Sequence, residues 1–125
     1  MRDLTIHLTH KPGELGRIAN LLGAAGVNLK SVAAMALGNQ GAARMIPDDI
    51  EAAREALRQA NVRFEESELV TVLRENRAGE LADVADRLSN AGLNLQALYV
   101  VGLDGDLVEL AIAVDDAKKA KKVLE

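Results

Sequence analysis

The residues of this chain whose types and spacing could do chemistry occur in two matched sets. Gly13-Glu14-Leu15 opens a helical pattern, and Gly26-Val27-Asn28 closes it. The same arrangement returns 66 residues later as Gly79-Glu80-Leu81 and Gly92-Leu93-Asn94. Nine of the seventeen positions that begin at Gly13 are identical in the second copy. The sequence therefore contains a duplicated unit, and a repeat of this kind is established before any other feature of a fold.

The chemistry that these residues suggest is the binding of a free amino acid. The glycines Gly13 and Gly79 allow a close approach to the backbone, and the helix that follows directs its free N–H groups and positive dipole end to the same point. A small carboxylate would fit there. The amides of Asn28 and Asn94 could accept a hydrogen bond from an ammonium group. A structural alternative stays open, in which Gly13 only allows the turn and Asn28 only satisfies hydrogen bonds of the loop after Gly26.

Other chemistries find little support. The two histidines, His7 and His10, would point to opposite faces of a strand, and there is no cysteine. The serines lie outside any pattern typical of a nucleophile, and the carboxylates fall on helix faces and helix starts. We therefore predict a protein that is not an enzyme and has no metal or cofactor.

Nucleic-acid binding is also disfavoured. The formal net charge is −4 and aromatic residues make up 2% of the chain, as Phe64 and Tyr99. A sheet that binds RNA needs aromatic stacking residues and a positive surface. The GxxG spacing at Gly23–Gly26 carries no basic residue, so it is weak support for a nucleic-acid-binding loop.

The elements that would position the first set form a split βαβ plait. Alternating apolar residues predict a strand over 2–9, and the period changes to helical from Glu14 to Gly26. Two strands follow at 27–37 and 42–46, separated by the turn signal Gly38-Asn39-Gln40-Gly41. Asp48 or Asp49 should cap a second helix that ends at Asn61, and Val62-Arg63-Phe64 reads as a short last strand. The order is β-α-β-β-α-β, a ferredoxin-like plait.

The second copy repeats this order but stops early. Its strands are predicted at 69–74, 94–103 and 107–114, with helices at 80–91 and from Asp115-Asp116 to the end at Glu125. The predicted fold class is α+β, with tandem ferredoxin-like βαββαβ plaits over residues 1–66 and 67–125, the second lacking its last strand.

A missing last strand would leave residues 69–75 as an open sheet edge, which invites pairing. This edge could pair with the same edge of another chain, could be covered by exchange of the linker and the Phe64 strand between the units, or could simply be exposed. The prediction that follows is a homo-oligomer, most simply a dimer.

Composition sets the remaining bounds. The chain has 125 residues, so each half is small and its core would be thin alone. Hydrophobic residues make up 49% with few aromatics, which predicts cores of Ala, Val, Leu and Ile. No apolar run approaches membrane-spanning length, and no signal peptide is recognisable. We expect a cytoplasmic protein with no membrane partner.

Lys11-Pro12-Gly13-Glu14-Leu15, the Ile18/Leu22 spacing and Gly26-Val27-Asn28-Leu29 together resemble an ACT domain. The second copy matches with Ala78 in place of the proline, so the resemblance covers essentially the whole chain as a tandem ACT protein without a catalytic domain. The resemblance implies side-by-side pairing of ACT units and amino-acid effectors at the interface between units. By similarity to the serine-sensing ACT domain of phosphoglycerate dehydrogenase, ligand contacts would come from the residue before the turn, His10 or Asn76, and from Asn28 or Asn94.

The hypothesis is a small regulatory or sensor protein that binds a free amino acid. The candidate ligand-binding residues are His10, Pro12, Gly13, Glu14, Leu15 and Asn28 in the first copy and Asn76, Gly79, Glu80, Leu81 and Asn94 in the second. The alternative is a regulatory subunit or interaction module that acts on a partner biosynthetic enzyme, by analogy with the small subunit of acetolactate synthase. The open 69–75 edge motivates this alternative.

Overall fold

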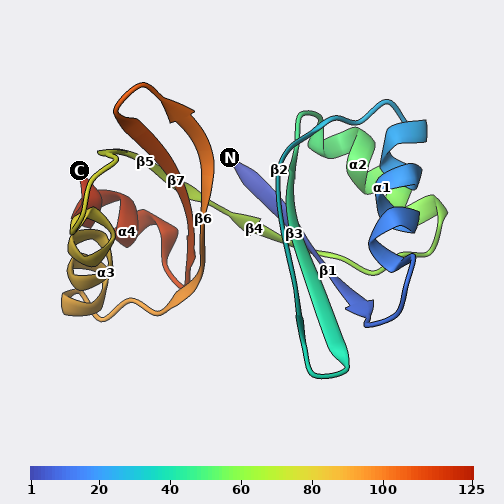
Figure 1. Cartoon of the computed structure of the whole chain (residues 1–125), viewed down its shortest axis with the longest axis horizontal. Coiled ribbons are helices and arrows are strands. Elements are labelled where there is room, and N and C mark those ends of the chain that lie inside the picture. The colour runs from blue at the N-terminus through green and yellow to red at the C-terminus, as the bar shows by residue number, and fades with distance from the viewer. The chain divides into compact units, whose positions relative to one another are not determined.

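The computed structural model describes all 125 residues as two compact units (Figure 1). One unit is Arg2–Ser67, and the other combines Met1 with Glu68–Glu125. Each unit has one sheet with two helices packed against it. None of the helices is both long enough and apolar enough to cross a bilayer.

The first unit follows the predicted βαββαβ order. Its sheet has the strand order β2-β3-β1-β4, with antiparallel pairing of β1 and β2 to β3. The helices connect β1 to β2 and β3 to β4. In chain order the elements are β1 (Arg2–Thr9), α1 (Glu14–Ala24), β2 (Leu29–Leu37), β3 (Gln40–Pro47), α2 (Ile50–Gln59) and β4 (Glu65–Glu68).

The prediction of a strand over Val62–Phe64 was wrong, because the strand forms at Glu65–Glu68 instead. Asn61 adopts a left-handed φ of 56° after α2. The Val62 N–H then bonds the Leu57 carbonyl at 2.9 Å and so belongs to the end of the helix. Val62 and Phe64 pack against the core of the unit rather than entering the sheet.

An ion pair fixes β4 to the preceding helix. Arg54 Nε on α2 donates to Glu66 Oε1 on β4. This hydrogen bond is also the main reason that the pKa of Arg54 is raised above its ordinary value. Arg54 is already charged at neutral pH, so the shift changes no protonation state, but it marks how closely the two elements are joined.

The second unit repeats the order without a strand after its last helix. The sheet order is β5-β7-β6, and both pairings are antiparallel, so β5 lies at one edge. The Leu69 N–H bonds the Met1 carbonyl at 2.7 Å, just before this edge strand begins. The elements are β5 (Val70–Glu75), α3 (Glu80–Asn90), β6 (Leu95–Asp104), β7 (Leu107–Val114) and α4 (Ala117–Leu124).

The helix ends carry the predicted capping residues. Asp49 caps α2 by accepting from the Ala52 N–H at 3.0 Å, and Asp116 caps α4 by accepting from the Lys119 N–H at 3.1 Å. Gly26 and Gly92 take φ values of 76° and 75° where α1 and α3 end. Local sequence signals therefore fix both the start and the end of these helices.

Each unit has its own aliphatic core, as the composition predicts. In the first unit Ile18 and Leu22 of α1 are fully buried with Leu57 of α2. In the second, Val84 and Leu88 of α3 occupy the equivalent places. Each helix thus has one apolar face against its sheet, which orients the loop before α1 or α3.

One charged pair distinguishes the first sheet from the second. Asp3 on β1 is fully buried, and Arg44 on β3 contacts both of its carboxylate oxygens, Nε to Oδ2 at 2.8 Å and Nη2 to Oδ1 at 3.2 Å. The register that aligns the two copies places Leu69 and Ala111 at these positions of the second unit. The second sheet therefore has apolar residues where the first has a bidentate ion pair.

Candidate functional site

The loops before α1 and α3 have the same unusual backbone. Gly13 has φ 91° and ψ −9°, and Gly79 has φ 91° and ψ −15°. Neither helix start has a side-chain cap. Apart from the Glu80 N–H, which bonds the Arg77 carbonyl at 3.4 Å, the N–H groups of the first turns therefore stay available to an external acceptor. A Cβ at either glycine would meet no atom within 4 Å. The conformation, rather than a close contact inside the chain, therefore requires glycine here.

Gly13→Ala and Gly79→Ala should each lower the free energy of unfolding by about 1–2 kcal/mol, the cost of a left-handed conformation for a residue with a Cβ. Gly16→Ala, inside α1, is the matched control because its added Cβ also meets empty space. It should instead stabilise the protein by about 0.5–1 kcal/mol, as expected in a helix interior. Urea denaturation of the three variants measures the difference, and equal effects at Gly13 and Gly16 would contradict the conformational argument.

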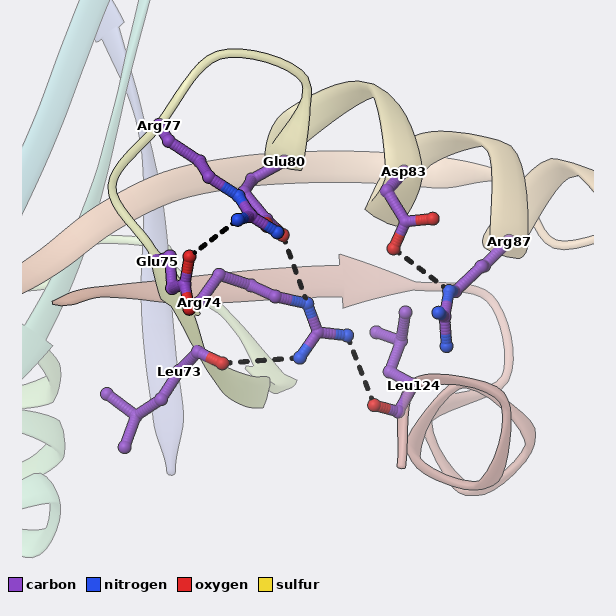
Figure 2. Close-up of polar contacts among 8 residues, drawn as sticks. All are labelled: Leu73, Arg74, Glu75, Arg77, Glu80, Asp83, Arg87 and Leu124. Atoms are coloured by element: carbon purple, nitrogen blue, oxygen red, sulfur yellow. Dashed lines mark hydrogen bonds and ion pairs between the residues drawn. The ribbon is translucent and has the colours of Figure 1, made fainter.

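A carboxylate of the chain itself already lies at each helix start. Glu14 is mostly buried, with Lys11 Nζ and Arg17 Nη2 each at 3.4 Å from its carboxylate. In the second copy Arg77 Nε approaches Glu80 at 2.8 Å and Arg74 Nε approaches it at 4.0 Å (Figure 2). A ligand carboxylate at this point would therefore share the helix start with an internal carboxylate and would rely on Lys11 or Arg77 as well as on backbone N–H groups.

The first copy has a small open hollow beside its helix start. Its volume is about 220 Å³, below the range typical of sites for drug-sized ligands. It joins the loop and the first turn of α1 to the middle of β2, so the structure brings three of the predicted site residues together with the alanine-rich strand. The lining residues are Leu8, Thr9, His10, Lys11, Glu14, Leu15, Ala34, Met35, Ala36, Gly41 and Ala42.

The second copy has a charged hollow of about 560 Å³ at the corresponding loop. Arg74 takes the place of Leu8, and its guanidinium bonds the carbonyl oxygens of Leu73 and Leu124, each at 3.2 Å (Figure 2). Arg77 and Arg87 contribute further charge, each paired with carboxylates. The two helix starts therefore share a backbone but differ in the side chains that surround them.

The two asparagines lie at the other end of the helices. Asn28 follows α1, whose eleven residues span about 16 Å, so Asn28 and Gly13 of the same unit lie at opposite ends of this helix. The Asn28 N–H bonds Asp48 Oδ1 at 3.0 Å, and the Asp48 N–H bonds the Asn28 carbonyl at 2.9 Å. Asn94 repeats the backbone bond to Asp115 at 3.2 Å and adds one from its side chain at 3.3 Å.

His10 and Asn76 lie at the glycine end. Their backbone N–H groups bond the carbonyls of the neighbouring hairpin turns, at Asn39 over 3.4 Å and at Asp106 over 2.7 Å. Pro12 and the partly exposed Leu15 and Leu81 complete the loop surfaces. No role was predicted for the cations Lys11 and Arg77, which recur at the repeat spacing of 66 residues. Asp48 was predicted as a possible cap of the second helix, and Asp115 at the start of the last one, but their carboxylates bond the backbone N–H groups of Asn28 and Asn94.

A model of the ACT domain pair matches residues 1–125, and the chain belongs to this family. The match covers both units, so the whole chain is a pair of ACT domains. A comparison with curated proteins gives no match.

Solved structures share the fold over nearly the whole chain. A protein from Bacteroides thetaiotaomicron superposes with a TM-score of 0.85 at 24% identity, covering 98% of this chain and 85% of that one. The alpha and beta subunits of an aspartokinase give 0.69 at 17% identity, with coverage of 98% and 88%. The ligand-free regulatory subunit of aspartate kinase from Thermus thermophilus gives 0.65 at 15% identity, also with 98% and 88%.

Proposed function

We propose that this ACT domain pair is a regulatory protein that binds a free amino acid at an interface between ACT units. The observation that carries the proposal is the repeated helix start, in which Gly13 and Gly79 share one left-handed conformation and no side chain caps the first turn. The conformation is costly for other residues, and its recurrence beside a cation in both copies suits the binding of a carboxylate.

The binding site needs two units. The carboxylate and ammonium of an α-amino acid are attached to one carbon, whereas Gly13 and Asn28 lie at opposite ends of α1. The ligand therefore contacts the helix start of one unit and the asparagine of another, where the exposed side chain of Asn28 or Asn94 accepts from its ammonium group. Glu14 or Glu80 supplies negative charge beside the same group.

The side-chain pocket of the first copy favours a small, uncharged residue. Ala34, Met35 and Ala36 form an apolar wall, and the volume is only about 220 Å³. Two or three charge-assisted hydrogen bonds of about 1.5–3 kcal/mol each, less the cost of association, correspond to about micromolar to millimolar affinity. Because the ligand joins two units, ligand binding and oligomer formation strengthen each other.

The double variant Asn28→Ala/Asn94→Ala tests the proposal. It should weaken amino-acid binding by about tenfold or more, the loss expected for one charged hydrogen bond, in isothermal titration calorimetry. Asn20→Ala is the control, since Asn20 is an exposed asparagine in the middle of α1 and should leave the affinity unchanged. Unaltered affinity in the double variant would contradict the proposed role of the asparagines.

A second candidate is a module that acts on a partner enzyme. Large apolar side chains are exposed on the edge strands β2 and β6, with Met35 72%, Leu37 80% and Leu103 71% exposed. Leu73 on β5 is also exposed, so the 69–75 edge is one of several candidate surfaces. Recovery of the native protein with a catalytic subunit would support this function, and recovery of a homo-oligomer alone would favour the amino-acid sensor.

A further inference from the structure

A larger hollow in the Arg2–Ser67 unit shares no lining residue with the hollow beside Gly13. Its volume is about 850 Å³. Its lining includes all of residues 60–64, the segment that connects α2 to β4 (Figure 1). The lining residues are Ile6, His7, Arg17, Arg58, Ala60, Asn61, Val62, Arg63, Phe64 and Glu65.

The charge of this hollow is predominantly positive. Three arginines, Arg17, Arg58 and Arg63, line it, and Glu65 is the one carboxylate residue. Arg17 approaches Glu14 at 3.4 Å, whereas Arg58 and Arg63 have no ion pair within the chain. The Arg58 guanidinium lies over the Phe64 ring, 5.9 Å from its centre. Like charges gathered in one hollow repel each other unless an anion compensates them.

In the second unit, by contrast, exposed arginines are paired with carboxylates. Arg77 lies 2.8 Å from both Glu75 and Glu80, and Arg87 lies 3.0 Å from Asp83 (Figure 2). Position 83 is the counterpart of Arg17 at the repeat spacing of 66 residues. The second unit therefore pairs these arginines with carboxylates, whereas Arg58 and Arg63 of the first unit have no such partner, within a chain whose net charge is −4.

Phosphate groups match this arrangement. A guanidinium presents a planar fork of donors that can hold two phosphate oxygens at once. Phe64, Ile6 and Val62 add apolar surface at the same hollow, and its volume lies within the range of small-molecule sites. We propose that the hollow binds a phosphorylated small metabolite through Arg17, Arg58 and Arg63, as a second ligand site of this chain that is separate from the amino-acid site.

Titration calorimetry with inorganic pyrophosphate tests this site in the full chain. The double variant Arg58→Gln/Arg63→Gln should weaken pyrophosphate binding by about tenfold or more. Arg17→Asp, which installs the residue of the second copy, should do the same. Lys119→Gln/Lys122→Gln is the matched control, because it removes two exposed positive charges of α4 that do not line this hollow, and it should leave the affinity unchanged. A thermal melt checks that each variant remains folded.

Parallel titrations with ATP and with a sugar bisphosphate identify the source of the phosphate. Tighter binding of ATP than of pyrophosphate would support a nucleotide, and tighter binding of the sugar bisphosphate would support a sugar phosphate. The absence of binding by all three probes up to about 5 mM, well beyond millimolar affinity, would overturn the proposal. An equal loss in the control variant would also overturn it. Neither result depends on whether the protein binds an amino acid.

Discussion

Replacing Arg44 with alanine is expected to lower the free energy of unfolding by about 3–5 kcal/mol, which is the range for breaking a buried ion pair by removing one partner. Asp3 is fully buried, and Arg44 contacts both of its carboxylate oxygens. Without the guanidinium the carboxylate keeps its cost of desolvation and loses its main compensation. Urea denaturation followed by circular dichroism measures the change.

The second copy supplies the control for this prediction. It carries Leu69 and Ala111 where the first copy carries Asp3 and Arg44. Exchange of a buried ion pair for apolar residues is often neutral or stabilising, so Asp3→Leu/Arg44→Ala should recover most of the stability that Arg44→Ala loses. If the double variant is as unstable as Arg44→Ala, the result would show that the ion pair contributes more to stability than the amount needed to offset its own desolvation.

Leu22→Ala should cost about 2–5 kcal/mol, because it leaves a cavity where a fully buried leucine of α1 contacts the first core. Leu37→Ala is the control, since Leu37 is 80% exposed and its truncation should change stability by no more than about 0.5 kcal/mol. Equal effects of the two substitutions in urea denaturation would contradict the assignment of the core.

The equivalent variant of the second unit, Leu88→Ala, should cost a similar amount for the same reason. Native-state hydrogen exchange then shows which amides each variant exposes. We expect Leu22→Ala to raise exchange chiefly in β1, β3 and α1, because Leu22 belongs to a core cluster separate from that of Leu88. A rise confined to α3 and β7 would contradict the separation of the cores.

The sequence predicts most of the fold because its signals are local and repeated. Asp49, Asp116, Gly26 and Gly92 act through their own backbone and nearest neighbours, so their roles could be predicted without tertiary information. The strand over Val62–Phe64 was wrong for a tertiary reason. Its apolar residues are used by the core of the unit, and the pairing strand forms from the polar segment Glu65–Glu68 that follows.

The sequence predicted which residues belong to the candidate site, but it did not predict how they are arranged in space. The spacing of Gly13 and Asn28 is visible in the sequence, but their separation by the length of α1 becomes clear only with the fold. Glu14 appeared as a motif residue, whereas its contacts with Lys11 and Arg17 depend on side-chain packing. Arg63 could not be associated with Arg17 and Arg58 in one hollow, because the segment that carries it was predicted as a strand.

The central claim is that this ACT domain pair binds a free amino acid at an interface between ACT units. A thermal-shift screen against the twenty amino acids, read beside size-exclusion light scattering, tests it most directly, since a ligand of the native state raises the melting temperature by mass action. We expect a selective rise with one amino acid or one class of small side chain, together with a more stable oligomer. No shift with any amino acid up to about 10 mM, a concentration well above the expected dissociation constants, would contradict the claim and favour a module that acts on a protein partner.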